Sequence, residues 1–217
     1  MADTPRIVGV SGWMRTGKDS VAALLVDFGY TRVSFADPLR KMAADIDPTI
    51  DLTNAPSDIH QEVNFGFPLT TYTTLLNAVG YERAKEVPDF RRFLQRLGTE
   101  GIRDNFGQDA WVNLFIAQIE AAPDDQKFVV PDVRFPNEAE MIKKIGGVVW
   151  RTERPGYGGG DHPSESMINE IVPNVILRAE SLLDQNGEKG LGTLVLEQLG
   201  ASTEDYDLRS WASKILG

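Results

Sequence analysis

The chain has 217 residues, 41% of them hydrophobic, a formal net charge of −10 and no cysteine. This size and composition suit one large globular domain, or one domain with an insertion. The missing cysteines exclude disulfides, thiolate zinc sites and cysteine nucleophiles, and the acidic balance disfavours polynucleotide partners. No apolar run is long enough to span a membrane, and residues 1–5 show no signal pattern, so we expect a cytoplasmic protein without membrane partners.

Strand-like and helix-like segments alternate along the chain. Strands are predicted over 6–11, 30–36, 127–133, 148–151 and 174–177. Helices are predicted over 18–28, from Asp37-Pro38-Leu39 onward, and over 89–104, 108–121, 136–145, 189–199 and 205–215. Residues 47–88, rich in Pro, Asn, Thr and Asp, are expected to be irregular or partly helical. The alternation predicts an α/β fold in three layers, with a parallel sheet of about five strands and helices on both faces.

The first strand and the first helix flank a glycine-rich segment with the spacing G-x-x-x-x-G-K. It comprises Gly12, Trp13, Met14, Arg15, Thr16, Gly17, Lys18, Asp19 and Ser20. Glycines let backbone N–H groups converge on an anion, and a helix N-terminus adds roughly half a positive charge at the same point. Lys18 can reach the β- and γ-phosphates of a nucleotide as a point charge. The segment therefore predicts a phosphate-binding loop, with an ordinary turn before a helix as the alternative.

The residue after the lysine departs from the usual loop, which has Ser or Thr there to bind Mg²⁺. Here that position is Asp19, followed by Ser20. A carboxylate is also a hard oxygen ligand, so Asp19 is a candidate metal ligand, directly or through water.

Charged residues follow two predicted strands, where ligands of α/β sheets bind. Asp132 ends the strand 127–133 and is a candidate Mg²⁺ ligand, with a solvated turn residue as the alternative. Arg134 would pair with phosphate oxygens in the same crevice. Asp37, with Lys41 one turn further on, is placed where an acceptor would bind, or Asp37 merely caps its helix.

The helix predicted over 89–104 carries several basic residues. Arg92 and Gln95 share a face that could clamp an anionic acceptor and hydrogen-bond a base, and Glu100 lies further along. The alternative is a solvated basic face. Trp111 offers a surface for stacking a base, although a tryptophan in a helical apolar stripe is more often a core residue.

Arg151 and Arg154 flank the start of a glycine-rich segment within 151–166. A lid here would exclude water and bring arginines onto a transferring phosphoryl group, whereas a loop without catalytic function is the alternative. Ser164-Glu165, after His162, is expected to begin a helix rather than to form a nucleophile system.

Several blocks together resemble the phage-type deoxynucleoside monophosphate kinases, over roughly residues 6–166. They are Gly12 to Ser20, Ser34-Phe35-Ala36-Asp37-Pro38-Leu39, Arg92 to Glu100, Asp109-Ala110-Trp111-Val112, Asp132 to Glu138 and His162-Pro163-Ser164-Glu165. The family's G-K-D sequence also accounts for Asp19. Met14 departs from members with a second basic residue there, and the last fifty residues match weakly.

The resemblance implies transfer of the γ-phosphoryl group of ATP, with Mg²⁺, to a (deoxy)nucleoside 5′-monophosphate. It assigns Arg15, Lys18 and Asp19 to the loop, Arg92 and Gln95 to the acceptor, and Asp132 and Arg134 to the strand end. Residues 1–217 would form a single P-loop kinase domain with an acceptor-binding insertion at 47–105 and a lid at 151–166. The expected partners are small nucleotides and a second copy in a homodimer, in the host cytoplasm if a phage encodes the protein.

Two other functions fit the same motifs. One is another P-loop small-molecule kinase, for example one that resembles the dephospho-coenzyme A kinases. The other is a regulatory protein that binds ATP without transferring phosphate.

Overall fold

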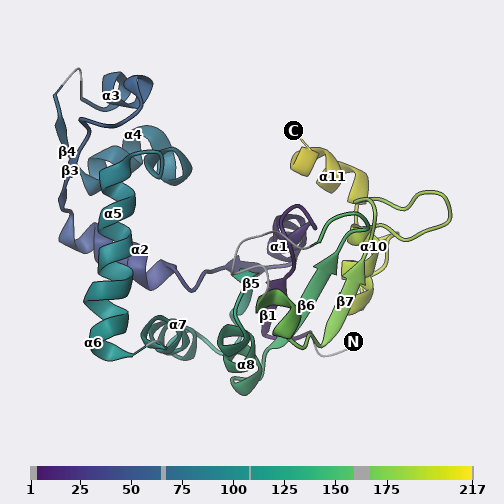
Figure 1. The fold of residues 1–217 in the computed structure, drawn as a ribbon. Helices are drawn as coiled ribbons and strands as arrows, with labels where there is room; N and C mark the ends of the chain where they lie inside the picture. Colours follow the sequence, from purple (N-terminus) through teal and green to yellow (C-terminus); the bar gives the residue numbers. More distant parts are fainter. Residues whose placement is uncertain (1–3, 65–66, 108, 159–166, 217) are drawn as a thin grey trace. The chain divides into compact units, whose positions relative to one another are not determined.

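The computed structural model describes residues 4–64, 67–107, 109–158 and 167–216 (Figure 1). The chain divides into two compact units. Unit 1 comprises residues 1–35 and 118–217, and unit 2 comprises residues 36–117. Within the described ranges, no helix combines the length and the apolar character needed to cross a bilayer.

Unit 1 is built on a five-stranded parallel sheet with the strand order β2-β5-β1-β6-β7. Its strands are β1 (Ile7–Ser11), β2 (Tyr30–Arg32), β5 (Lys127–Val133), β6 (Val148–Glu153) and β7 (Val175–Arg178). Ser11 at the end of β1 is in register with Val133 on one side and Arg151 on the other. The carboxyl ends of the central strands therefore meet along one edge, and the predicted α/β class with a parallel five-stranded sheet is confirmed.

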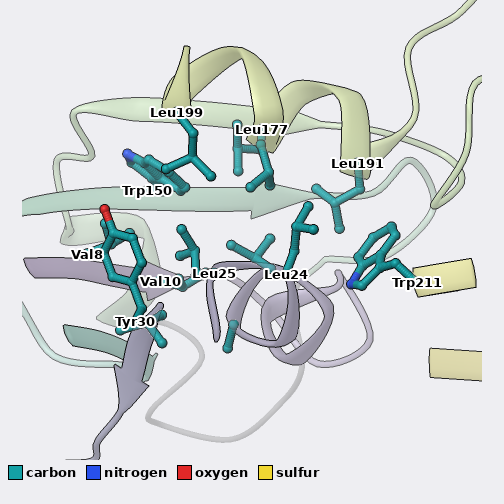
Figure 2. Close-up of a cluster of buried hydrophobic side chains, with 14 of the residues drawn as sticks. Val8, Val10, Leu24, Leu25, Tyr30, Trp150, Leu177, Leu191, Leu199 and Trp211 are labelled. Atoms are coloured by element: carbon teal, nitrogen blue, oxygen red, sulfur yellow. The ribbon is translucent and has the colours of Figure 1, made fainter. Parts of the chain in front are cut away.

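Helices cover both faces of this sheet. They are α1 (Lys18–Asp27), α8 (Pro136–Lys144), the 3₁₀-helix η2 (Met167–Glu170), α10 (Leu191–Leu199) and α11 (Leu208–Leu216). On one face, Leu24 of α1, Leu199 of α10 and Trp211 of α11 share a buried core with Trp150 of β6 (Figure 2). On the other face α8 packs closely, since a β-carbon on Gly9 would lie 2.6 Å from Cδ1 of Ile142.

The second strand is shorter than predicted. The segment 30–36 was expected to be extended, but β2 ends at Arg32. The backbone N–H of Val33 still bonds to Val129, whereas the side chain of Ser34 turns to donate a hydrogen bond to Asp132 at 2.8 Å. The segment after β2 therefore binds Asp132 of β5 through the Ser34 side chain and does not extend the sheet.

Unit 2 has its own hydrophobic core. Its elements are α2 (Asp37–Ile46), β3 (Thr49–Asp51), α3 (Ser57–Asn64), β4 (Leu69–Thr71), α4 (Tyr72–Ala84), α5 (Pro88–Arg96), the π-helix η1 (Leu97–Arg103), α6 (Asp104–Phe106) and α7 (Ala110–Glu120), whose last residues belong to unit 1. Strands β3 and β4 pair antiparallel. Tyr72 stacks on Phe90 with ring centroids 5.0 Å apart, beside the buried Ile50 and Leu75. The predicted insertion 47–105 lies inside this unit. Residues 47–88, expected to be irregular or partly helical, contain α3 and α4.

The helix predicted over 89–104 changes its type midway. Regular α5 ends at Arg96 and the wider η1 follows. Side chains outside η1 bind its carbonyl oxygens: Trp111 donates from Nε1 to Gly98 at 2.9 Å, and the Asn105 amide donates to Glu100 and Gly101. These contacts satisfy carbonyl groups that a regular α-helix would use internally.

Candidate nucleotide-binding site

The glycine-rich segment forms a tight loop between β1 and α1. Gly12, Arg15 and Gly17 have positive φ angles of 143°, 64° and 98°. A β-carbon on Gly12 would lie 2.4 Å from Oγ1 of Thr152, so no other residue fits there without movement of β6. The loop ends at Lys18, the first residue of α1, and its backbone has the turn that a phosphate-binding loop needs.

Lys18 is held inside this loop. Its ammonium group donates a hydrogen bond to the carbonyl oxygen of Trp13 at 2.7 Å. The Thr16 hydroxyl bonds to the same carbonyl at 2.9 Å. The charge of Lys18 is thus kept at the mouth of the loop, where the N-terminus of α1 already favours an anion.

A cavity of about 730 Å³ opens beside the loop, within unit 1. Loop residues from Arg15 to Ser20 form one wall, and Arg154 adds a second cation. The remaining lining comes from beyond β7. Its apolar residues are Ala179, Leu182, Leu183, Leu191, Ala212, Ile215 and Leu216, and its polar residues are Glu180, Ser181, Asp184 and Gln185. Of the predicted loop residues, Gly12, Trp13 and Met14 do not line this cavity. A charged end and an apolar end in one cavity fit a ligand with phosphates and a flat apolar ring system.

The two predicted metal ligands have different surroundings. Asp19 lines the cavity and pairs with Arg32 at 2.5 Å, with 79% of its side chain exposed. Asp132 lies in β5 outside the lining, and its Oδ2 accepts the hydrogen bond from Ser34. No cluster of three or more metal-ligating side chains occurs among the residues described. Mg²⁺ needs only one or two carboxylates when substrate phosphates and water complete its shell, so these aspartates fit the ion.

Arg134 directly follows β5, and Glu138 lies in the first turn of α8. Arg134 is exposed, and its backbone N–H donates to Glu138 Oε2 at 2.8 Å; the N–H of Phe135 donates to the same atom at 3.1 Å. Burial raises the pKa of Glu138 from its ordinary 4.5 to about 7, and the nearby Asp132 charge adds to this shift against the two backbone hydrogen bonds. Glu138 therefore ties the turn that carries Arg134 to the start of α8.

The two arginines predicted for the lid are placed differently. Arg154 lines the cavity and its guanidinium lies 4.7 Å from the ring centre of Tyr157. Arg151 is buried, and its guanidinium donates to the carbonyls of Ile168, at 2.6 Å, and Ile171. Burial also lowers its pKa. The catalytic role expected for Arg151 thus conflicts with its contacts, because both bonds hold the segment around η2. Residues 159–166 of the expected lid, with His162, Ser164 and Glu165, lie outside the described residues.

The predicted acceptor residues lie in unit 2, in which a second cavity of about 520 Å³ follows one side of α5 and η1. Arg92, Arg96 and Glu100 line it; Arg96 pairs with Glu100 at 3.2 Å and Arg92 pairs with Asp89. Gln95 is exposed and does not belong to this lining. The cavity thus joins Arg92, Arg96 and Glu100, whereas Gln95, expected on the same face as Arg92, is not part of its lining.

Three further predicted acceptor residues do not line this cavity. Asp37 pairs with Arg40 at 3.1 Å at the start of α2, and Lys41 pairs with Asp45 at 2.7 Å. Trp111 is 5% exposed and donates to η1, so it offers no free face for stacking a base. Its indole is a core group, which was the alternative for a tryptophan in an apolar stripe.

The sequence did not predict roles for Thr152, Glu138 and Asp89, or the part of the cavity lining that comes from residues 179–191. A buried threonine in a strand carries no signal of its proximity to a loop 136 residues earlier. Glu138 was within reach of prediction, because Pro136 and a glutamate two residues later suit the first turn of a helix.

Together the sheet, the loop and the cavity define a nucleotide-binding protein of the P-loop kinase type. The family model described as deoxynucleotide monophosphate kinase matches residues 81–170. A protein of Acanthamoeba polyphaga mimivirus, provisionally named deoxynucleotide monophosphate kinase, is 30% identical over 184 residues, covering 76% of this chain and 83% of the relative. The chain therefore belongs to the deoxynucleotide monophosphate kinase family.

Phage relatives are similar as well. The deoxynucleoside-5′-monophosphate kinase of Escherichia phage T5 is 24% identical over 212 residues, with 75% of this chain and 84% of that protein covered. The deoxynucleotide monophosphate kinase of Enterobacteria phage T4 is 28% identical over 109 residues, which is 48% of this chain and 44% of the relative.

Proposed function

We propose that the chain transfers the γ-phosphoryl group of ATP to a deoxynucleoside 5′-monophosphate, giving ADP and the diphosphate. The observation that carries the proposal is the cavity of about 730 Å³, which continues from the phosphate-binding loop to an apolar wall. The names of the mimivirus and phage relatives support the choice of acceptor.

The donor would lie with its phosphates at Lys18 and the N-terminus of α1. Its base would lie against the apolar wall that includes Leu182, Leu191 and Ala212. Lys18 would leave the carbonyl of Trp13 for the β- and γ-phosphates, because a charged phosphate oxygen is the stronger acceptor. Arg15 and Arg154, which line the same cavity, would neutralise the charge of the transferring group.

Asp19 would hold Mg²⁺, directly or through water, and Asp132 would bind its waters from β5. When bound, the ion would offset the negative charge of the phosphates during the transfer. Ser34 fixes the orientation of Asp132 through the bond at 2.8 Å, and Arg32 restrains Asp19.

The acceptor would bind in the cavity of unit 2, with Arg92 and Arg96 on its phosphate. Their carboxylate partners, Asp89 and Glu100, keep the two guanidinium groups oriented until a phosphate displaces them. Glu100 would then be available to accept a hydrogen bond from the sugar or the base. Phosphoryl transfer needs alignment and charge neutralisation more than proton transfer, so no general base is assigned.

The substrates suggest where the protein acts. ATP and deoxynucleotides are small cytoplasmic molecules, so we place the enzyme in the cytoplasm, that of the host if a virus encodes it. The predicted homodimer remains a prediction.

An acceptor screen tests the proposal. The protein is incubated with ATP and Mg²⁺, either alone or with one common ribo- or deoxynucleoside monophosphate or dephospho-coenzyme A. ADP and the phosphorylated acceptor are measured by chromatography. We expect diphosphate formation from at least one deoxynucleotide. ADP formation that ignores the acceptor, or phosphorylation of dephospho-coenzyme A alone, would contradict the assignment.

A further inference from the structure

Thr152 of β6 lies directly beneath the phosphate-binding loop. It is fully buried, and its hydroxyl oxygen is 2.7 Å from the hydroxyl oxygen of Thr16. Thr16 is 4% exposed and in turn bonds to the carbonyl of Trp13. The contact therefore joins the middle of the loop to a central strand of the sheet.

The distances favour one direction for these bonds. Each hydroxyl donates once, and the Thr16 hydroxyl can satisfy the Trp13 carbonyl at 2.9 Å. The Thr152 hydroxyl then donates to Thr16, because two oxygens 2.7 Å apart without a shared proton would repel each other. Its other acceptor, the Ser11 carbonyl, is more distant at 3.3 Å. The resulting chain runs from Thr152 through Thr16 to Trp13.

This chain ends on the carbonyl that also accepts the hydrogen bond from Lys18. When Lys18 moves to the phosphates, the Trp13 carbonyl loses that donor and keeps the Thr16 hydroxyl. The loop can then retain its shape only if Thr16 stays in place. The close approach of Gly12 to Thr152 fixes the other end of the loop against the same side chain.

We propose that Thr152 is a positioning residue for the nucleotide donor, which holds the phosphate-binding loop in its binding shape through Thr16. The inference depends on the proposed function, since it assumes that the loop binds the phosphates of ATP. Thr152 itself does not line the cavity, so it would act on the donor only through the loop.

The test compares Thr152→Ala with Thr152→Ser. Both remove the methyl group, and only the serine keeps the hydroxyl. The dissociation constant for ADP with Mg²⁺ is measured by calorimetry, and the KM values for ATP and acceptor by a coupled assay. For Thr152→Ala relative to Thr152→Ser we expect ADP affinity to fall and the KM for ATP to rise by about fivefold to tenfold, with the acceptor KM unchanged. Equal ADP affinities for the two variants would overturn the proposal.

Two controls separate positioning from stability. Thr70→Ala truncates a buried threonine in unit 2 whose hydroxyl has no partner among the described residues, and it should leave ADP affinity unchanged. The double variant Thr16→Ala/Thr152→Ala should bind ADP no more weakly than Thr16→Ala alone, because the two hydroxyls act in series. If Thr152→Ala does not fold, Thr152→Val against the wild type carries the same comparison, because valine keeps the volume and removes only the hydroxyl; weaker ADP binding is again expected, and equal affinities again count against the proposal.

The wild-type protein distinguishes failure of this inference from failure of the proposed function. A wild type that binds no ADP and phosphorylates no acceptor would refute the function. An active wild type with an equally tight Thr152→Ala variant would refute only the role of Thr152.

Discussion

The side chain of Leu191 packs directly against Gly17: a β-carbon placed on Gly17 would lie 2.5 Å from Cδ2 of Leu191. Gly17 is the last residue before α1, and Leu191 begins α10 and lines the same cavity. The end of the phosphate-binding loop and the apolar wall are therefore in contact. A change at either residue should affect both stability and nucleotide binding.

We expect Gly17→Ala to lower the free energy of unfolding by about 2 to 4 kcal/mol, because the new methyl group meets Leu191 and the φ angle of 98° strains any other residue. Gly29→Ala is the matched control, since Gly29 has a φ of 84° but nothing within 4 Å of a new β-carbon. It should cost only the backbone strain, about 1 to 2 kcal/mol. Urea denaturation measures both, and equal losses would show that Leu191 does not restrict Gly17.

Arg92 should matter for the acceptor and not for the donor. Arg92→Ala removes a cation from the cavity in unit 2, and we expect the acceptor KM to rise about 10-fold to 100-fold while the KM for ATP stays within twofold. Arg91→Ala removes another exposed arginine of α5 that does not line the cavity and should change neither value. Steady-state kinetics with each substrate varied in turn measure both KM values. An unchanged acceptor KM in Arg92→Ala would show that the acceptor does not bind in this cavity.

Arg151 and Arg154 should give opposite phenotypes. Arg154→Met removes a cation from the donor cavity, so kcat should fall about 100-fold or more with little change in stability. Arg151→Met removes the guanidinium that donates to the carbonyls of Ile168 and Ile171, so stability should fall by about 2 to 4 kcal/mol. Its kcat at low temperature should remain close to that of the wild type. Thermal unfolding and steady-state kinetics on the same samples measure both effects. A large loss of kcat in Arg151→Met without a loss of stability would indicate that Arg151 is catalytic after all.

Glu138 should make stability depend on pH. Its pKa is about 7 in the folded protein and near 4.5 when unfolded, so the unfolded chain releases this proton first as the pH rises. Stability is then fully present below pH 4.5 and lost as the pH rises to about 7, by at most about 3 kcal/mol. Glu138→Gln keeps an oxygen for the N–H groups of Arg134 and Phe135 and has no proton to lose. Relative to the wild type, it should become more stable between pH 5 and 8; a difference that does not change with pH would refute the shift.

Local patterns predicted the sheet well and the polar contacts poorly. The strand 127–133 was predicted with the bounds of β5, because its apolar run is flanked by clear turn residues. The extension of β2 to residue 36 was wrong, since Ser34 bonds to a residue 98 positions later. The π-helix η1 was not predicted either, because Trp111 and Asn105, which hold it, leave no trace in the periodicity of residues 97–103.

The candidate site shows the same division. The loop from Gly12 to Ser20 could be located because its glycines and lysine have a fixed spacing set by phosphate geometry. The functions of Trp111 and Arg151 could not be judged from sequence, because an indole or a guanidinium can donate a hydrogen bond to a ligand or to a backbone carbonyl. Only the fold determines which partner is near.

The most direct test of the account is Lys18→Ala, measured with ATP, Mg²⁺ and the deoxynucleotide that the wild type accepts. Lys18 donates to the carbonyl oxygen of Trp13 within its own loop, and circular dichroism and thermal unfolding first establish that the variant is folded. We predict that a folded Lys18→Ala variant forms less than about 1% of the wild-type amount of diphosphate per unit time. Full turnover by this folded variant would contradict the account.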